Sequence, residues 1–496
     1  MFIYQKGVRT YMSEHIITDR LKKRKALEEQ GISCYPHNYN PTHTATSVLQ
    51  TYADIGATPS EEEVCVAGRI MLYRNMGKIC FFQVQDSSGR VQAVCSEKNT
   101  HAFPLVEELD LGDIVGVCGP VFRTKTGEVS IQVHTLTLLA KSIRPPPEKY
   151  HGVKDVELRY RKRYLDLISN QESRKVFVMR TKIISQIRAY LDNQGFLEVE
   201  TPVLQPLYGG ANARPFITTH NALQTELFLR ISPELYLKRL IIGGFEKVYE
   251  LTRNFRNEGI DTTHNPEFTM IEWYQAYADY TVMMQQTEEL FSLLARTVHG
   301  NETIQFEDKE ISFSAPFARI RMTDAIKKYV NIDVESLTTE EILAECEKRK
   351  ISVVQQTWGH AVQELFDAYV EEQLIQPTFI IDYPVETSPL TKKHRSDDRF
   401  VERFELFING WEIANAYSEL TDPIDQKERF EQQVAERAKG DDEAQPYDAD
   451  FIVAMEHGMP PTGGIGIGID RLVMLLAGKQ SIRDVILFPT LRPEEK

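Results

Sequence analysis

The sequence is poor in cysteine, with six in 496 residues and none of them spaced as CxxC. Zinc sites and disulfide frameworks are usually marked by closely spaced cysteines, so we expect neither here. The scattered distribution is typical of a protein from the reducing cytoplasm. The cysteines are Cys34, Cys65, Cys80, Cys95, Cys118 and Cys346.

Long hydrophobic runs are also missing. No apolar stretch approaches the ~20 residues that a membrane-spanning helix requires. The opening, MFIYQKGVRTYMSEH, has no apolar segment of the kind found in secretion signals. Met12 is an alternative start to Met1. We therefore expect a cytoplasmic protein with no membrane partner.

The chain has no excess of positive charge, because its formal net charge is −15 at pH 7. This balance argues against loose, unspecific binding of nucleic acid. It leaves a specific RNA partner open, because phosphate contacts need only local basic patches. Two such patches occur, at residues 20–25 and 159–163. Each is either a solvated helix face or an RNA contact.

At roughly 150 residues per domain, the length predicts about three domains. The hydrophobic content of 42% and the charged content of 26% are ordinary for globular proteins. Residues 1–62 are expected to form an N-terminal extension. Within it, residues 13–31 are predicted to form a helix that Ser13 caps and Gly31 ends.

Residues 63–145 contain short strands separated by turns. Five strands of this length fit a small barrel, for which the OB-fold is the commonest choice. Alternation directs Phe82 to the core and Phe81 to the outer face, where an aromatic ring can stack on an unpaired base. A partly buried packing role for Phe81 is the alternative. The predicted strands are Val64–Arg74, Lys78–Gln85, Arg90–Cys95, Ile114–Arg123 and Glu128–Leu138.

A proline run at 145–147 begins a predicted linker, residues 146–170. The rest of the chain, residues 171–496, is expected to form one domain with a helical insertion around residues 323–375. Its first elements are an amphipathic helix over Glu172–Asn193 and a following strand that ends in proline. These two elements belong either to a homodimer interface or to the core.

The most informative stretch is Lys247–Tyr274. Two segments rich in β-forming residues, 248–255 and 269–274, flank a polar loop at 259–266, which predicts a long hairpin. Solvated faces and core faces rarely mix charged and aromatic side chains in this way. A ligand with a flat ring, a phosphate and an amine would use them all, whereas an exposed hairpin with random charges is the alternative. Alternation places on one face Arg256, Glu258, Phe268, Met270, Glu272 and Tyr274.

A second hairpin is predicted in RFELFINGWEI, residues 403–413, by its Asn-Gly turn. With this turn, Phe407 lies opposite Glu412 and Glu405 lies opposite Ala414. The two glutamates are then diagonal neighbours, ~7–8 Å apart at the backbone. They could hold one hard cation, which prefers oxygen ligands. Two surface carboxylates are the alternative.

The strand continues with Asn415, Tyr417 and Glu419. Regular alternation would put these side chains on the face opposite to Glu412. We predict a bulge near Ala414, because only a bulge would bring both sets to one site.

The last informative segment is Gly463–Arg471, a glycine-rich strand that leads into a helix. The glycine spacing fits a dinucleotide-binding motif poorly, and no second strand of a βαβ unit follows. Arg471 stands at the helix start, behind glycines that let a ligand approach the backbone.

Three segments in order resemble the signature motifs of the class II aminoacyl-tRNA synthetases. They are Gly195–Pro202 for motif 1, Phe255–Glu258 for motif 2 and Gly466–Arg471 for motif 3. Four further segments resemble the lysine-specific group of bacterial type: Tyr208–Phe216, Pro233–Lys238, His264–Met270 and Glu412–Leu420. The resemblance extends over the chain from about residue 13.

This resemblance implies an α+β fold. An OB-fold β-barrel that binds the anticodon would occupy residues 63–145. A class II catalytic domain would follow, with an antiparallel sheet of six or more strands flanked by helices, in a homodimer. The implied reaction is the ATP-dependent activation of L-lysine to lysyl-adenylate, followed by transfer of the lysyl group to the 3′ end of tRNA(Lys). The implied cofactor is Mg²⁺, without zinc.

The resemblance also implies site residues, and none of these positions departs from the family's pattern. The implied catalytic residues are Arg256 and Arg471. ATP would bind to Arg256, Glu258, His264, Phe268, Glu405, Glu412 and Arg471, with Glu405 and Glu412 as the metal ligands. Lysine would bind to Gly210, Glu234, Arg256, Glu272, Tyr274, Asn415, Tyr417 and Glu419. The anticodon uridines would be read by Phe81, Gln92 and Glu128.

Physical chemistry supports a dibasic substrate. Lysine brings two ammonium groups into a partly dry pocket, and each needs a carboxylate there to offset its desolvation. Glu234, Glu272 and Glu419 are three candidates. Adenylate formation needs no general base, because the attacking carboxylate is already ionised, so positioning and charge neutralisation can carry the step.

Three other functions compete with this one. The first is a class II relative that charges aspartate or asparagine, which would need a cation where Glu419 stands. The second is an enzyme that lysylates a protein, and relatives of that kind lack the front barrel. The third is a non-catalytic RNA-binding protein, which should have lost Arg256, Arg471 or the metal-binding glutamates.

Overall fold

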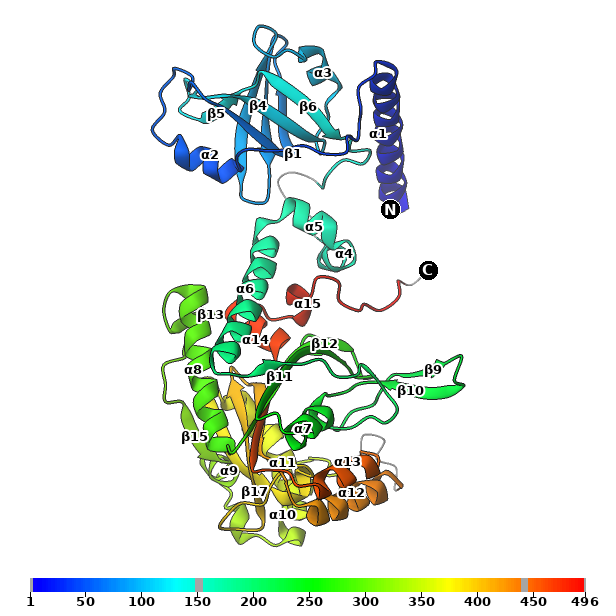
Figure 1. Cartoon of the computed structure of the whole chain (residues 1–496), viewed down its shortest axis with the longest axis vertical. Helices are drawn as coiled ribbons and strands as arrows, with labels where there is room; N and C mark the ends of the chain where they lie inside the picture. The colour runs from blue at the N-terminus through cyan, green and yellow to red at the C-terminus, as the bar shows by residue number, and fades with distance from the viewer. Residues whose placement is uncertain (1–2, 148–154, 439–444, 495–496) are drawn as a thin grey trace. The chain divides into compact units, whose positions relative to one another are not determined.

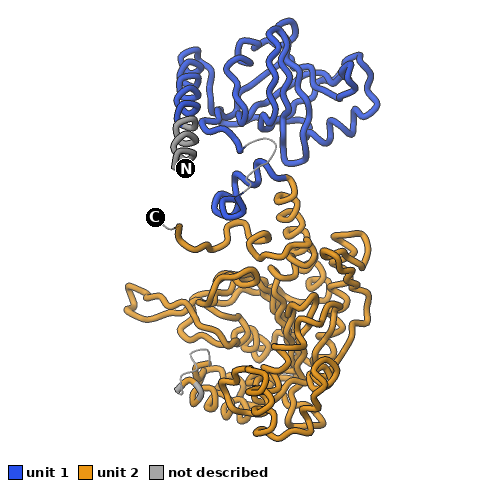
Figure 2. The backbone as a smooth tube through the Cα atoms, turned by 180° about the vertical axis from the view of Figure 1, so that it is seen from behind, with its two compact units in different colours: residues 1–170 blue, residues 171–496 orange. Residues whose placement is uncertain are grey.

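The structure is a computed structural model that describes residues 3–147, 155–438 and 445–494. The chain divides into two compact units, residues 1–170 and 171–496 (Figure 2). Within the described ranges, no helix combines the length and apolar character needed to cross a membrane.

The first unit is built on a six-stranded sheet with the order β1-β2-β3-β5-β4-β6, in which β1 also pairs with β4. The predicted fifth strand is divided in two. Between the two parts, Val133 donates its amide to the carbonyl oxygen of Val94 and His134 donates to that of Cys118. The strands are β1 (Glu63–Asn75), β2 (Ile79–Gln85), β3 (Arg90–Ser96), β4 (Ile114–Arg123), β5 (Val129–Gln132) and β6 (Thr135–Ala140).

Alternation along β2 is confirmed. Cys80, Phe82 and Val84 are fully buried in the core of the unit, whereas Phe81 is only partly buried on the outer face. The helices of this unit are α1 (Ile3–Glu29), α2 (Ala45–Thr51), α3 (Phe103–Glu108), α4 (Val156–Arg161) and α5 (Arg163–Ser169). Two of them, α4 and α5, lie within the predicted linker, and residues 148–154 of that linker lie outside the described residues.

Helix α1 begins ten residues before the predicted start, so the cap assigned to Ser13 is wrong. Residues 3–12 contain no proline to stop a helix there. The two basic patches are partly structural. Arg20 donates to the carbonyl oxygens of Ser142 and Leu111 at 2.8 and 2.9 Å. Arg163 and Asp166 form a buried ion pair at 2.9 Å.

The expectation that the chain has no disulfide is wrong, because Cys65 and Cys118 are bonded. The two residues lie directly opposite each other in the β1–β4 pairing although they are 53 positions apart in the sequence. Strand pairing brings them together, which their spacing does not reveal. The other cysteines are free and buried.

The second unit is built on an eight-stranded sheet with the order β15-β16-β17-β18-β19-β12-β11-β7. Most pairs are antiparallel, as expected, and the outermost pairs at both edges are parallel. The strands are β7 (Leu197–Glu198), β11 (Lys247–Phe255), β12 (Glu267–Ala276), β15 (Ala318–Arg321), β16 (Thr378–Pro384), β17 (Phe400–Ile408), β18 (Trp411–Ser418) and β19 (Thr462–Gly468).

Helices lie on both faces of this sheet (Figure 1). The apolar stripe of α6, which includes Ile183 and Leu191, packs with α8 and α14 around Trp273 in the main core. On the opposite face, Leu237 and Ile241 of α7 pack against β11 and β12. The helices are α6 (Gln171–Asn193), α7 (Glu234–Ile242), α8 (Tyr280–His299), α12 (Pro423–Ala438), α13 (Ala449–Glu456), α14 (Ile469–Leu476) and α15 (Ile482–Val485).

The predicted insertion forms three helices with a hydrophobic core of their own, next to β16 and β17. They are α9 (Met322–Val330), α10 (Thr339–Lys348) and α11 (Trp358–Tyr369), and the short 3-10 helix η2 (Glu371–Gln373) follows them. A hairpin of β9 (Ile217–His220) and β10 (Thr225–Leu229) projects from the body of the unit in Figure 1.

Candidate active site

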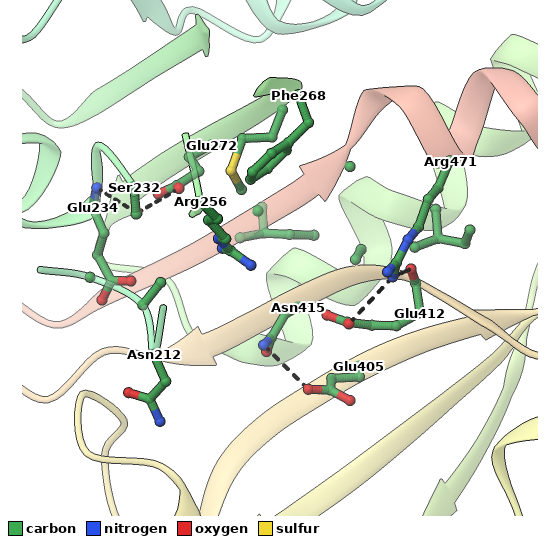
Figure 3. A pocket seen from close by; sticks show the side chains of 18 of the residues that line it. Asn212, Ser232, Glu234, Arg256, Phe268, Glu272, Glu405, Glu412, Asn415 and Arg471 are labelled. Carbon is green, nitrogen blue, oxygen red and sulfur yellow. Dashed lines mark hydrogen bonds and ion pairs between the residues drawn. The ribbon is translucent and has the colours of Figure 1, made fainter. Parts of the chain in front are cut away.

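A cavity of about 430 Å³ lies on the face of the large sheet that packs against α7. It is lined by β12, β17, β18, β19, the loop that follows β11, the loop of residues 387–391 and the segment of residues 210–212. Both predicted hairpins and the glycine-rich strand therefore meet at one place (Figure 3). The predicted site residues that line the cavity are Gly210, Glu234, Arg256, Glu258, His264, Phe268, Glu272, Tyr274, Glu405, Glu412, Asn415, Tyr417 and Arg471.

The predicted bulge in the second hairpin is present. Leu406 pairs with Ala414 and Phe407 pairs with Glu412, so Ile413 is the extra residue. The predicted pairing of Glu405 with Ala414 is wrong, because this bulge shifts the register and Glu405 pairs with Asn415. The shift places Glu412 and Asn415 on the same face although they are three positions apart.

Arg256 occupies the middle of the cavity, between Phe268 and Asn415 in Figure 3. Its guanidinium carbon lies 5.1 Å from the centroid of the Phe268 ring. Within the described residues, its buried Nε has no hydrogen-bond acceptor. A buried donor without an acceptor is costly, so the position suits an anionic ligand.

Arg471 and His264 lie together at one end of the cavity. Arg471 is the third residue of α14, and its Nη1 donates to the carbonyl oxygen of Glu412 at 2.8 Å. Its Nη2 is 3.1 Å from His264 Nε2, and the other ring nitrogen of His264 is 2.8 Å from Asp261 Oδ2. Arg471 and His264 therefore bring hydrogen-bond donors together where the loop of the first hairpin meets the start of α14.

The two glutamates of the second hairpin form an acidic patch. Glu405 accepts a hydrogen bond from the Tyr383 hydroxyl at 2.8 Å and contacts Arg403 and Asn415. Burial raises the pKa of Glu405; Arg403 opposes the shift, and the charge of Glu412 adds to it. A buried carboxylate that is repelled by the neighbouring, partly exposed carboxylate of Glu412 suits a divalent cation with oxygen ligands.

The helical insertion also contributes to this patch. Burial raises the pKa of Glu371 in η2 to about 7, and the charges of Glu412 and Glu405 contribute. No periodic or spacing signal marks Glu371 in the sequence, because its proximity to the patch depends on how the insertion folds back on β17 and β18.

The other end of the cavity is rich in buried glutamates. Glu272 accepts hydrogen bonds from Ser232 Oγ at 2.8 Å and from the Tyr274 hydroxyl at 3.0 Å. Burial raises the pKa of Glu272 to about 8, and the nearby charge of Glu234 adds to the shift. Buried acidic groups at this end favour a ligand with positive charge.

Glu419 lies directly behind the cavity wall and is 1% exposed. A Cβ at Gly464, which lines the cavity, would overlap the Glu419 carboxylate and the Tyr274 ring. The glycine therefore gives both side chains the room to approach the cavity.

Lys238 is a site residue that we did not predict. It is fully buried, and its Nζ lies 2.6 Å from Glu234 Oε1 and 2.5 Å from Glu419 Oε2. The spacing of Glu234 and Lys238 on one helix, at i and i+4, was the available signal for their contact. The contact with Glu419 depends on the tertiary structure.

The three predicted anticodon residues lie in the first unit. Phe81 on β2 pairs with Val94 on β3, and Gln92 on β3 pairs with Gln83 on β2. Gln92 Nε2 donates to Ser130 Oγ at 2.9 Å, and Glu128, just before β5, is exposed. Phe81 and Gln92 share the outer face of neighbouring strands.

Comparisons with known proteins identify the class. The family model described as tRNA synthetases class II (D, K and N) matches residues 155–492. The model described as OB-fold nucleic acid binding domain matches residues 64–139, which confirms the OB-fold in the first unit. The chain therefore belongs to the class II tRNA synthetases of the D, K and N group.

Similar proteins over nearly the full length identify the subgroup. A protein of Moorella thermoacetica named Lysine--tRNA ligase is 52% identical over 484 residues, which is 96% of this chain and 98% of the relative. A protein of the same name from Carboxydothermus hydrogenoformans is 51% identical over 485 residues, 97% of this chain and 98% of the relative. Within its class, the chain is a member of the lysine--tRNA ligase family. The resemblance noted from the motifs is confirmed.

Proposed function

We propose that the chain activates L-lysine with ATP to form lysyl-adenylate and then transfers the lysyl group to the 3′ end of tRNA(Lys). The observation that carries this proposal is the distribution of charge in the cavity. Buried glutamates lie at one end, Arg256 lies in the middle, and Arg471 lies at the other end beside the Glu405–Glu412 pair. The two ammonium groups of a dibasic amino acid complement the glutamates, and the phosphates of a nucleoside triphosphate complement the arginines.

Lysine is assigned to the end that contains the buried glutamates. Its α-ammonium is received by Glu234 beside Gly210, and its ε-ammonium by Glu419 and Tyr274, with Glu272 nearby. Asn415 and Tyr417 complete the enclosure of the amino acid. Each ammonium group meets a carboxylate in a dry environment, which offsets the cost of removing it from water.

ATP is assigned to the other end. Phe268 and Arg471 enclose the adenine ring, Glu258 contacts its amino group and His264 meets the distal phosphates. Arg256 binds both the α-phosphate and the lysine carboxylate. The unpaired Nε of Arg256 supports this role, because an oxyanion would supply the missing acceptor.

Glu405 and Glu412 would hold Mg²⁺, since both offer the hard oxygen ligands that this ion requires. The ion would neutralise phosphate charge. The other requirements of adenylate formation are met by side chains of the protein. Arg256 aligns the lysine carboxylate for attack on the α-phosphate and offsets the developing negative charge. The new bond joins a carboxylate oxygen to phosphorus as the bond to pyrophosphate breaks.

The first unit is assigned to tRNA. Residues 63–145 would bind the anticodon through Phe81, Gln92 and Glu128, with stacking on Phe81 as the main contact. Residues 171–496 would form the catalytic domain.

A homodimer is supported by exposed apolar side chains on α6, on the edge strand β7 and shortly after it. Val178, Leu197 and Leu204 are 65%, 48% and 47% exposed. We place the protein in the cytoplasm, with no zinc and no membrane partner.

The test is amino-acid-dependent exchange of pyrophosphate into ATP, measured across the standard amino acids, followed by charging of total tRNA. Lysine should support exchange at least a hundredfold better than aspartate or asparagine, and tRNA(Lys) should be charged. Equal exchange with aspartate, or lysine exchange without tRNA charging, would contradict the proposal.

A further inference from the structure

Lys238 is a buried cation that the proposed reaction leaves without a role. Burial lowers the pKa of Lys238, but Glu234 and Glu419 outweigh this effect and raise it to about 12. Its ammonium is therefore charged at neutral pH. It contacts one oxygen of each carboxylate, at 2.6 and 2.5 Å.

The two carboxylates come from different parts of the fold. Glu234 is the first residue of α7, and Glu419 follows the last residue of β18. Lys238 lies one helical turn after Glu234, so its ammonium connects α7 to the end of β18. One cation that contacts both carboxylates holds them at a fixed separation, because movement of either one loses an ion pair in a dry environment.

The Glu419 carboxylate can accept a further hydrogen bond. Its Oε2 contacts the Lys238 ammonium at 2.5 Å, whereas its buried Oε1 has no hydrogen-bond donor within the described part of the chain. The carboxylate lies between Lys238 and the cavity wall at Gly464. A ligand ammonium that reaches this wall would therefore find an acceptor whose position is already set.

We propose that Lys238 sets the separation of Glu234 and Glu419 and thereby selects the length of the diamino acid. This inference rests on the proposed function, in which these carboxylates receive the α- and ε-ammonium groups. Lysine spans the two acceptors, whereas ornithine, which is one methylene shorter, leaves one of them without its donor. Lys238 is in this sense a positioning and specificity-determining residue.

The decisive variant is Lys238→Met, which keeps an unbranched side chain and removes the charge. Pyrophosphate exchange is measured with lysine and with ornithine. The KM for lysine should rise at least tenfold, and the KM for ATP should stay within about twofold. The preference for lysine over ornithine in kcat/KM should fall at least tenfold, since one methylene is typically worth about 10–200-fold in a fitted pocket.

Lys141→Met is the matched control. Lys141 is also a buried lysine that contacts two carboxylates, Asp110 at 2.6 Å and Asp113 at 2.8 Å, but it lies in the first unit. Its loss should lower the unfolding temperature without changing the lysine preference. Lys238→Gln is the second variant if Lys238→Met does not fold, and it should show the same loss of preference.

The outcomes separate the two proposals. If the unmodified protein shows no lysine-dependent exchange, the proposed function itself fails. If it shows that exchange and a soluble Lys238 variant keeps the original preference for lysine over ornithine, the role of Lys238 is wrong. An equal rise in the KM values for lysine and ATP would also overturn it, because a general loss of structure would produce that result.

Discussion

Gly464→Ala is the substitution for which the structure gives the clearest quantitative expectation. The added methyl group would overlap the Glu419 carboxylate and the Tyr274 ring, and both side chains are buried. The backbone at this position does not have a positive φ, so the effect comes from the overlap alone. Overpacking of this kind costs about 1–3 kcal/mol.

If this cost falls on the lysine end of the cavity, the KM for lysine should rise roughly 5–150-fold, since about 1.4 kcal/mol corresponds to a factor of ten. The KM for ATP should change by less than about twofold. Both constants are obtained from pyrophosphate exchange with one substrate varied at a time.

The control is Gly468→Ala in the same strand, where the nearest atom to the added methyl group is 3.9 Å away. This variant should leave the KM for lysine within about twofold. The steric explanation is wrong if Gly464→Ala also leaves the KM for lysine unchanged, or if both variants raise this KM equally.

Four further outcomes follow from the site. Arg256→Ala should lower the rate of exchange by about 10²–10³-fold or more, and near-normal exchange would contradict its role. Glu419→Gln should raise the KM for lysine far more than that for ATP, and equal rises would exclude an ammonium contact. Burial raises the pKa of Glu272 above its unfolded value to about 8. Its protonated form therefore stabilises the fold at low pH, and this stabilisation is lost as the pH rises from about 5 to 8. Melting curves of the ligand-free protein should show this decline, and Glu272→Gln should reduce it. Phe81→Ala should raise the KM for tRNA roughly 5–150-fold by loss of stacking, with pyrophosphate exchange unchanged.

Local patterns predicted the elements of the site well. The turn residues and alternation of 247–274 and 403–413 specified both hairpins, because strand period and turn chemistry are properties of neighbouring residues. A bulge was predicted because Glu412 and Asn415 are three positions apart, which puts them on opposite faces of a regular strand, whereas a common site requires them on the same face. The pairings of β11 with β12 and the register shift at Ile413 confirm these predictions.

These local patterns could not predict contacts between segments that are distant in the sequence. The pairing of Cys65 with Cys118 depends on β1 and β4 lying side by side. The proximity of Glu371 to the acidic patch depends on the fold of the insertion. The contact of Lys238 with Glu419 joins a helix to the end of a strand about 180 residues later in the chain. No local periodicity encodes such contacts, because tertiary packing decides them.

The bulge at Ile413 has a consequence for changes in the length of the chain. Ile413 is the residue of β18 that has no partner on β17, so its removal would leave Glu412, Asn415 and Tyr417 on their present face. Loss of Ala416, the residue directly after Asn415, would instead turn the following side chains to the other side of the sheet. Single-residue deletions in this strand are therefore unequal: one position accommodates a shorter chain, and its neighbours do not.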